Sequence, residues 1–201
     1  TMLILGIDCA YKSMGVCLLR VGGDDINNFI KVEFLEVFDL IDGVKTDDID
    51  RSELIKHLKG LLFYLDANLP KPDLVCIEYQ MNINNLTNSM SDIIYFHYTD
   101  KKQNLQNFYN DKTKSICIKN VDMQTTEVKY IKPALKNKCK ILPLSDFTAK
   151  YSTQYRANKE HSKAIFLLFC EKFTYKHNIQ KKYLDDAADA FLTALCGLDS
   201  F

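Results

Sequence analysis

Residues 2–8 have the sequence Met2-Leu3-Ile4-Leu5-Gly6-Ile7-Asp8, an apolar run that ends at a carboxylate. A continuous apolar run of this length is typical of a strand buried on both faces of a sheet. A carboxylate at the end of such a strand costs free energy unless a proton or a cation neutralises it. The stretch therefore predicts a central first strand and marks Asp8 as a candidate functional residue.

Three further acidic residues follow the same logic. Glu78 ends a second apolar run, Leu74-Val75-Cys76-Ile77-Glu78, and Asp186 and Asp189 open an alanine-rich helix near the end of the chain. A spacing of three places Asp186 and Asp189 on one helix face. Neighbouring alanines let that helix lie close to a sheet. Any one of these acids could merely cap a turn or favour a helix N-terminus, but four that converge predict a metal site.

The remaining pattern predicts an α/β fold. Further strands are expected at about 15–21, 29–40, 73–78 and 127–131, and helices at about 51–66, 89–109, 157–173 and 184–198. Three early strands followed by alternating helices and strands predict a five-stranded mixed sheet flanked by helices on both faces. We expect one domain over residues 1–201, with an insertion around 110–125.

Composition sets the class of protein. The chain has 201 residues, of which 47% are hydrophobic and 26% charged, as in ordinary globular proteins. No stretch approaches the roughly 18 apolar residues of a membrane span, so we expect no membrane partner. Seven cysteines, mostly within apolar runs, predict buried thiols in a reducing, intracellular compartment. Zinc is not expected, since no Cys-x-x-Cys motif occurs and the four histidines are scattered.

Charge is divided unevenly along the chain, although the net charge is zero. Residues 1–100 hold 8 Lys/Arg and 16 Asp/Glu, whereas residues 101–201 hold 18 and 10. Eight lysines fall between residues 112 and 140. Such asymmetry indicates an interaction surface for an anionic partner, although a run of lysines can also be a solvated face.

These motifs resemble, in order and spacing, the RuvC-type Holliday junction resolvases, which have an RNase H-like fold. The similarity rests on Ile7-Asp8 followed by Gly15-Val16, on Ile77-Glu78-Tyr79-Gln80, and on Asp186-Ala187-Ala188-Asp189-Ala190. The Glu-x-Gln triplet is most similar to the poxvirus and mitochondrial branch. The chain differs from the family pattern at Cys9-Ala10 and at Tyr79, where arginine is common. Neither difference removes a carboxylate.

The resemblance implies a metal-dependent, structure-selective endonuclease that resolves four-way DNA junctions by paired symmetric nicks. Asp8, Glu78, Asp186 and Asp189 would be its catalytic residues and metal ligands, holding two Mg²⁺ ions, with Mn²⁺ expected to substitute. Contacts to branched DNA are expected from the tyrosine and glutamine after Glu78 and from two lysines four residues apart: Tyr79, Gln80, Lys159 and Lys163. A viral enzyme of this kind would act in the host cytoplasm or nucleus, at sites of viral DNA replication.

A homodimer is expected as well. A four-way junction offers two symmetry-related strands, while one chain holds a single set of four acids, so two active sites match the twofold substrate. The aromatic-rich helix expected at 89–109 is the candidate interface.

Other functions remain open from the sequence. Another RNase H-like nuclease, acting on RNA·DNA hybrids or as a transposase, would use similar ligands, and a non-catalytic junction-binding protein could keep the fold. A kinase of the actin and hexokinase type is disfavoured, since it needs two such domains and a glycine-rich phosphate loop.

Overall fold

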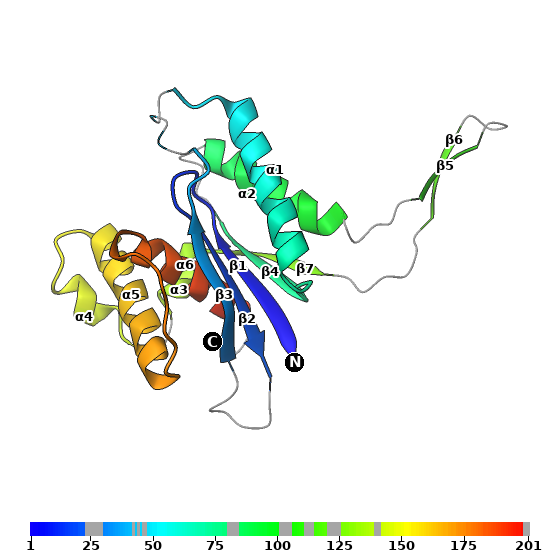
Figure 1. The fold of residues 1–201 in the computed structure, drawn as a ribbon. Helices are drawn as coiled ribbons and strands as arrows, with labels where there is room; N and C mark the ends of the chain where they lie inside the picture. The colour runs from blue at the N-terminus through cyan, green and yellow to red at the C-terminus, as the bar shows by residue number, and fades with distance from the viewer. Residues whose placement is uncertain are drawn as a thin grey trace.

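The computed structural model describes residues 1–22, 30–41, 43, 45, 48–79, 85–100, 106–110, 115–119, 126–138 and 142–198, the side chains of Asp100, 106–110 and 115–119 excepted. Its centre is a five-stranded mixed sheet with helices on both faces (Figure 1). The strands, in their spatial order, are β3 (Ile30–Phe38), β2 (Met14–Val21), β1 (Met2–Asp8), β4 (Leu74–Glu78) and β7 (Glu127–Ile131).

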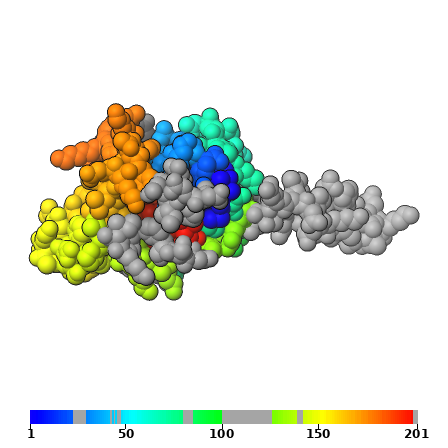
Figure 2. Space-filling view, turned by 90° about the horizontal axis from the view of Figure 1, so that it is seen from below, coloured from blue at the N-terminus to red at the C-terminus, as the bar shows by residue number. Residues whose placement is uncertain are grey.

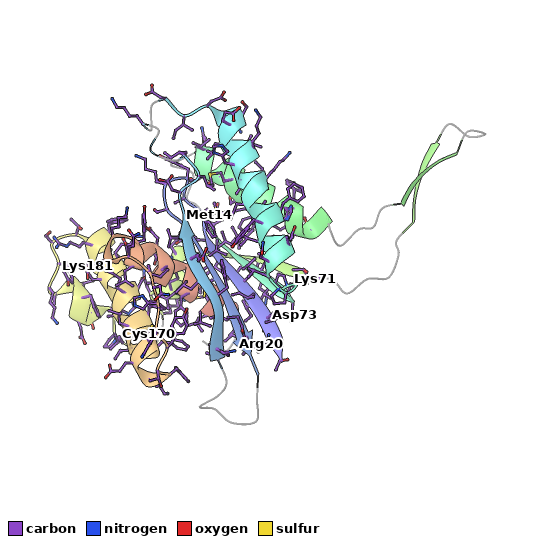
Figure 3. All side chains as sticks on the ribbon, viewed as in Figure 1. Met14, Arg20, Lys71, Asp73, Cys170 and Lys181 are labelled. Carbon is purple, nitrogen blue, oxygen red and sulfur yellow. The ribbon has the colours of Figure 1, made fainter. Side chains whose placement is uncertain are left out.

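Pairing within the sheet changes direction at β1. Strands β1, β2 and β3 form an antiparallel meander, whereas β4 is parallel to β1 and β7 is parallel to β4. The predicted five-stranded mixed sheet and its central first strand are therefore confirmed. Met14 and Arg20 mark opposite ends of β2 in Figure 3, and the Met14 end is the one where β1 reaches Asp8, which pairs with Gly15.

Helices α1 (Arg51–Asn68) and α2 (Asn85–Asp100) cover one face of the sheet. Helix α1 begins after Asp50, whose side chain accepts a hydrogen bond from the Ser52 amide at 2.7 Å. Its leucines face the sheet and pack against Leu5, Ile7 and Leu18. This apolar stripe explains why the helix forms where the sequence predicts it, with one further half-turn at its C-terminus.

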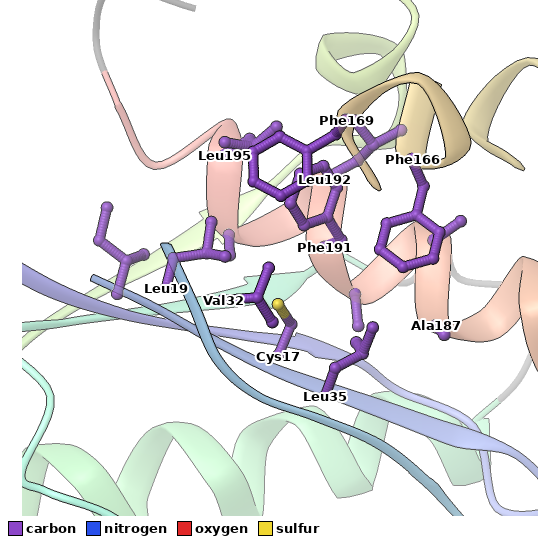
Figure 4. Packing of buried hydrophobic residues seen from close by; sticks show 14 of the residues in the cluster. Cys17, Leu19, Val32, Leu35, Phe166, Phe169, Ala187, Phe191, Leu192 and Leu195 are labelled. Atoms are coloured by element: carbon purple, nitrogen blue, oxygen red, sulfur yellow. The ribbon is translucent and has the colours of Figure 1, made fainter. Parts of the chain in front are cut away.

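Helices α5 (Gln154–Lys172) and α6 (Leu184–Leu195) cover the other face. Figure 4 shows Phe191, Leu192 and Leu195 of α6 above Cys17, Leu19 and Val32 of the sheet. The space-filling view shows α5 (orange) on the opposite side of the blue strands from α1 (cyan to green) (Figure 2). Three shorter helical segments complete this side of the chain: α3 (Pro133–Lys136), α4 (Ser145–Thr148) and the 3₁₀ turn η3 (Lys181–Tyr183).

Two glycines allow the backbone of α6 to lie directly against the backbone of the strands. A Cβ atom on Gly6 would lie 2.4 Å from the Ala190 carbonyl oxygen, and one on Gly15 would lie 2.3 Å from the Asp186 carbonyl oxygen. Neither approach is possible for a residue with a side chain unless the helix moves away. The close approach sets the position of the acidic residues at the start of α6.

One expected helix is corrected by the structure. Residues 89–109 do not form a single helix: α2 ends at Asp100, and Phe108 and Tyr109 belong to strand β5 (Gln106–Asn110), which forms an antiparallel hairpin with β6 (Ser115–Lys119). Aromatic residues favour strands as readily as they extend a helical stripe. The hairpin overlaps the start of the expected 110–125 insertion. A membrane-crossing segment is not found among the described helices, none of which combines sufficient length and apolarity.

Candidate active site

Two of the four predicted carboxylates meet at one edge of the sheet. Asp8 is the last residue of β1 and Glu78 the last residue of β4, and the register pairs their predecessors, Ile7 and Ile77. Because these strands are parallel, their carboxyl ends lie side by side. The Asp8 and Glu78 carboxyl groups share a hydrogen bond.

Helix α6 brings the other two acids to the same place. Asp189 is 6% exposed, as is Asp8, and Asp186 lies one turn earlier on the helix. All four acids line one open cleft of about 520 Å³. Its other lining residues are Cys9, Ala10, Ser13, Tyr79, Pro133, Lys136, Asn137, Tyr155, Asn158, Lys159 and Ser162. The convergence expected from the sequence is therefore present in the structure.

Lys136, the last residue of α3, was not singled out from the sequence. Its ammonium lies 2.6 Å from Oε1 of Glu78 and 3.2 Å from Oδ1 of Asp189, and its side chain is 7% exposed. A fully buried lysine is rare unless it is paired. The sequence offered a weak signal: Lys136 follows the β7 strand end after a single proline-started turn, which places it at the edge of the sheet where Glu78 lies.

Lys159 enters the acid cluster from α5. Its ammonium lies 2.6 Å from Oδ2 of Asp189, 3.7 Å from Oδ1 of Asp186 and 4.0 Å from Oδ2 of Asp185. Its side chain is 20% exposed, more than that of Lys136. The lysine expected to contact DNA thus lies inside the acid cluster.

The surroundings shift the pKa values of the acids in two opposite directions. Burial, together with the charge and hydrogen bond of Glu78, raises the pKa of Asp8 well above its ordinary value, and Lys136 only partly opposes this. Burial also raises the pKa of Asp186, with Lys159 opposing it. Asp8 therefore keeps a proton more readily than a solvated aspartate does.

Asp189 behaves in the opposite way. Burial alone would raise the pKa of Asp189, but the charges of Lys136 and Lys159 and the hydrogen bonds from Lys159 and Ser162 outweigh it, and the net direction is downward. The charges of Asp189 and Asp8 raise the pKa of Lys136 and that of Lys159, against the effect of burial. Two ammonium groups thus face the acid cluster, and Asp8 holds a proton more readily than an ordinary aspartate.

The donor set suits a hard divalent cation, because four carboxylates supply only oxygen and face an open cleft. As the side chains stand, however, no three acidic, histidine or cysteine side chains in the described part of the chain are arranged to hold an ion. Lys136 and Lys159 take up both oxygens of Asp189. The residue types fit a divalent metal, and a metal ion at Asp189 requires at least one of the two ammonium groups to move away.

Aromatic side chains flank the acids. Tyr79 follows Glu78 and is 42% exposed; its ring packs edge-on against Tyr130 at 6.2 Å, and Tyr130 stacks on Tyr95 at 5.4 Å. Tyr155, at the start of α5, is 73% exposed and lines the same cleft. Sequence reasoning missed Tyr155 because nothing in its local pattern separates it from any surface tyrosine.

The other two residues expected to contact DNA, Lys163 and Gln80, are not found in the acid cluster of the described structure. Lys163 lies one turn after Lys159 on α5 and pairs with Glu160 at 2.6 Å, so it does not enter the acid cluster. Gln80 lies outside the described residues. Phosphate contacts by Lys159 and Lys163 stay predictions.

Comparison with known proteins supports the fold. No family model matches the sequence, and no curated protein matches it significantly. Among solved structures, the chain is similar to RNase H-like junction resolvases. One is the fowlpox virus resolvase in complex with substrate Holliday junction DNA (TM-score 0.56, 21% identity, 99% of this chain and 98% of that chain). Another is RuvC of Thermus thermophilus (TM-score 0.53, 14% identity, 97% and 94%). At these identities the likeness establishes a shared fold, as the sequence resemblance predicted.

Proposed function

We propose that this protein is a divalent-metal-dependent endonuclease that resolves four-way DNA junctions by paired nicks. The observation that carries the proposal is the convergence of Asp8, Glu78, Asp186 and Asp189 in one cleft, at the edge of the sheet where the parallel strands end. The fold shared with the fowlpox and Thermus resolvases supports the choice of substrate, since structures of both in complex with a Holliday junction substrate are known.

Asp8, Glu78, Asp186 and Asp189 would hold the metal. Bound there, two divalent ions would activate a water molecule and stabilise the leaving oxygen of the scissile phosphodiester. The protein contributes the fixed position of the acids: the β1 and β4 backbones hold Asp8 and Glu78, and Gly6 and Gly15 let α6 carry the other two to within reach. Lys136 keeps one positive charge beside Glu78 and Asp189 throughout.

Residues around the acids would bind the DNA. Lys159 and Lys163 lie on one side of α5 and would meet phosphates, because DNA binding draws largely on Lys and Arg contacts to the backbone. Tyr79 and Tyr155 lie at the cleft and present aromatic rings to solvent, where bases unstacked at an opened crossover could stack. Gln80 is proposed as a further contact on the strength of its place after Tyr79.

A cleavage assay on matched substrates tests the proposal. The protein is incubated with a labelled four-way junction, a linear duplex, a flap and an RNA·DNA hybrid of the same sequence, with Mg²⁺, with Mn²⁺ and with EDTA. We expect symmetric nicks in the junction only when metal is present. Preferential cleavage of the hybrid would indicate a different RNase H-like nuclease. Tight junction binding without cleavage under any metal would indicate a non-catalytic binding protein.

The proposed enzyme acts as a homodimer, because the described part of each chain places its four candidate acids in one cleft and a junction has two strands to cut. Large exposed aromatic side chains on the outer side of α1 and α2, Phe63 at 65% and Phe96 at 57%, support this face as the interface. Analytical ultracentrifugation at micromolar concentration, with and without junction DNA, is the test. A persistent monomer that still makes both nicks would contradict the dimer. An intracellular, reducing location stays a prediction.

A further inference from the structure

The two ammonium groups of the acid cluster are held differently. Lys136 connects two elements, because its ammonium lies between Glu78 at the end of β4 and Asp189 on α6. Lys159 contacts acids of α6 alone, and its side chain is nearly three times as exposed, 20% against 7%. Lys136 is therefore enclosed by the fold, whereas Lys159 can swing toward solvent without breaking a contact between sheet and helix.

Each carboxylate oxygen of Asp189 faces an ammonium group while both lysines are in place. Its Oδ1 faces Lys136 at 3.2 Å and its Oδ2 faces Lys159 at 2.6 Å. A divalent ion binds carboxylate oxygen at about 2.0–2.6 Å. A metal ion would therefore need the space beside Oδ2 that the Lys159 ammonium fills. With both bound to the same oxygen, the metal ion and the ammonium group would repel each other strongly.

Asp186 is affected by the same lysine. Its Oδ1 lies 3.7 Å from the Lys159 ammonium, so the pair of acids on α6 is covered by one side chain. Lys159 forms no ion pair with Asp8 or Glu78 at the strand ends, although the charge of Asp8 also acts on its ammonium. Moving Lys159 therefore uncovers the α6 half of the acid cluster first.

We propose that Lys159 is a displaceable internal counterion that closes the Asp186–Asp189 half of the site in the DNA-free protein. A divalent cation takes its place at Asp189, and the ammonium turns outward to a DNA phosphate. Metal loading of this half is then coupled to substrate, because a phosphate near α5 stabilises the outward position of Lys159. The inference rests on the proposed nuclease function and adds an order of events to it.

The test measures metal binding without DNA and without activity. Mn²⁺ binding to the 201-residue chain without DNA is followed by electron paramagnetic resonance of the free ion, for the wild type, Lys159→Met and Lys159→Gln. Both variants remove the ammonium; glutamine keeps a hydrogen-bond donor near Asp189 and serves if the methionine variant does not fold. We expect Mn²⁺ affinity to rise at least about tenfold in both, because a like charge has left the site.

Lys163→Met is the matched control. It removes the same charge from the same helix one turn away, but Lys163 pairs with Glu160 and does not contact the acid cluster. We expect its Mn²⁺ affinity to stay within about twofold of the wild type, since only long-range attraction changes.

The outcomes separate the two proposals. Equal Mn²⁺ affinity in the wild type and in a folded Lys159 variant overturns the exchange and leaves the nuclease intact. An equal gain in Lys163→Met also overturns it, because net charge would then explain the effect. Absence of Mn²⁺ binding in every protein at millimolar concentration overturns both the exchange and the proposed metal site.

Discussion

Gly6 of β1 lies so close to α6 that a Cβ atom on it would be 2.4 Å from the carbonyl oxygen of Ala190. This contact fixes the height of α6 above the strands, and through it the distance from Asp189 to Asp8. The position of the acids thus depends on the absence of a side chain in the middle of the sheet.

Gly6→Ala should destabilise the protein by about 1–3 kcal/mol, because the added methyl group forces apart a backbone contact that cannot be relieved by a side-chain rotation. Urea denaturation measures the loss. Gly60→Ala is the matched control: Gly60 lies in α1, and a Cβ atom on it would have nothing within 4 Å, so alanine there should stabilise by about 0.5–1 kcal/mol. Similar effects of the two substitutions would contradict the close-packing argument.

Asp8→Asn, Glu78→Gln, Asp186→Asn and Asp189→Asn should each abolish junction cleavage while leaving junction binding largely intact. Each change keeps the size of the side chain and removes one metal-binding charge. Gel assays of cleavage and of binding in Ca²⁺ separate the two effects. Near-normal cleavage by any two of these variants would remove the metal-site argument, and loss of binding would assign the acids a structural role.

Stability without metal should depend on pH through Asp8. Because the folded-state pKa of Asp8 is raised, the folded protein keeps a proton that the unfolded chain releases above about pH 4. The free energy of unfolding therefore falls as pH rises from there through the raised pKa. In EDTA, Asp8→Asn should be more stable than the wild type at about pH 8, with the difference shrinking toward about pH 4. If the stability difference between Asp8→Asn and the wild type instead grew as the pH fell, the pKa of Asp8 would not be raised in the folded protein.

Lys159→Ala and Lys163→Ala should each lower the salt dependence of junction binding by about one unit of slope, since each would remove one of the proposed phosphate contacts. Fluorescence anisotropy over a range of salt concentrations gives the slope. Lys56→Ala is the control, because Lys56 forms the same i,i+3 pair with Glu53 on α1, which covers the other face of the sheet. Unchanged slopes for both α5 variants would make these lysines ordinary surface residues.

Tyr79→Ala should weaken junction binding about tenfold, within the roughly 1–3 kcal/mol that base–aromatic stacking contributes, while Tyr79→Phe should change it little. Tyr64→Ala offers a comparison, since Tyr64 is exposed to nearly the same extent, 44% against 42%, but lies on α1. Quenching of 2-aminopurine placed at the crossover reports the stack directly. Equal losses for Tyr64 and Tyr79 would contradict the stacking argument, because Tyr64 does not line the cleft.

The strands and the acids at their ends could be predicted because buried strands carry a strong local signal. The run to Asp8, the run to Glu78 and the alanine-rich start of α6 each combine apolar periodicity with a carboxylate that needs a partner. The structure places all four acids in one cleft.

Lys136 and the range 89–109 show where local patterns fail. The place of Lys136 after a strand end is a weak signal, and the tertiary contact with Glu78 and Asp189 is what distinguishes it from a solvated lysine. Phe108 and Tyr109 continue an aromatic-rich helix as plausibly as they form a strand, and pairing with β6 decides the outcome. Both errors concern information held in contacts that span many residues.

Helix α6 packs directly on β1, although nearly the whole chain separates the two in sequence. Closing so long a loop is entropically costly and tends to come late in folding. Asp186 and Asp189 therefore join Asp8 only when the final docking step is complete. During refolding from urea, recovery of junction cleavage should follow the slowest kinetic phase and lag behind the early gain of helical circular dichroism.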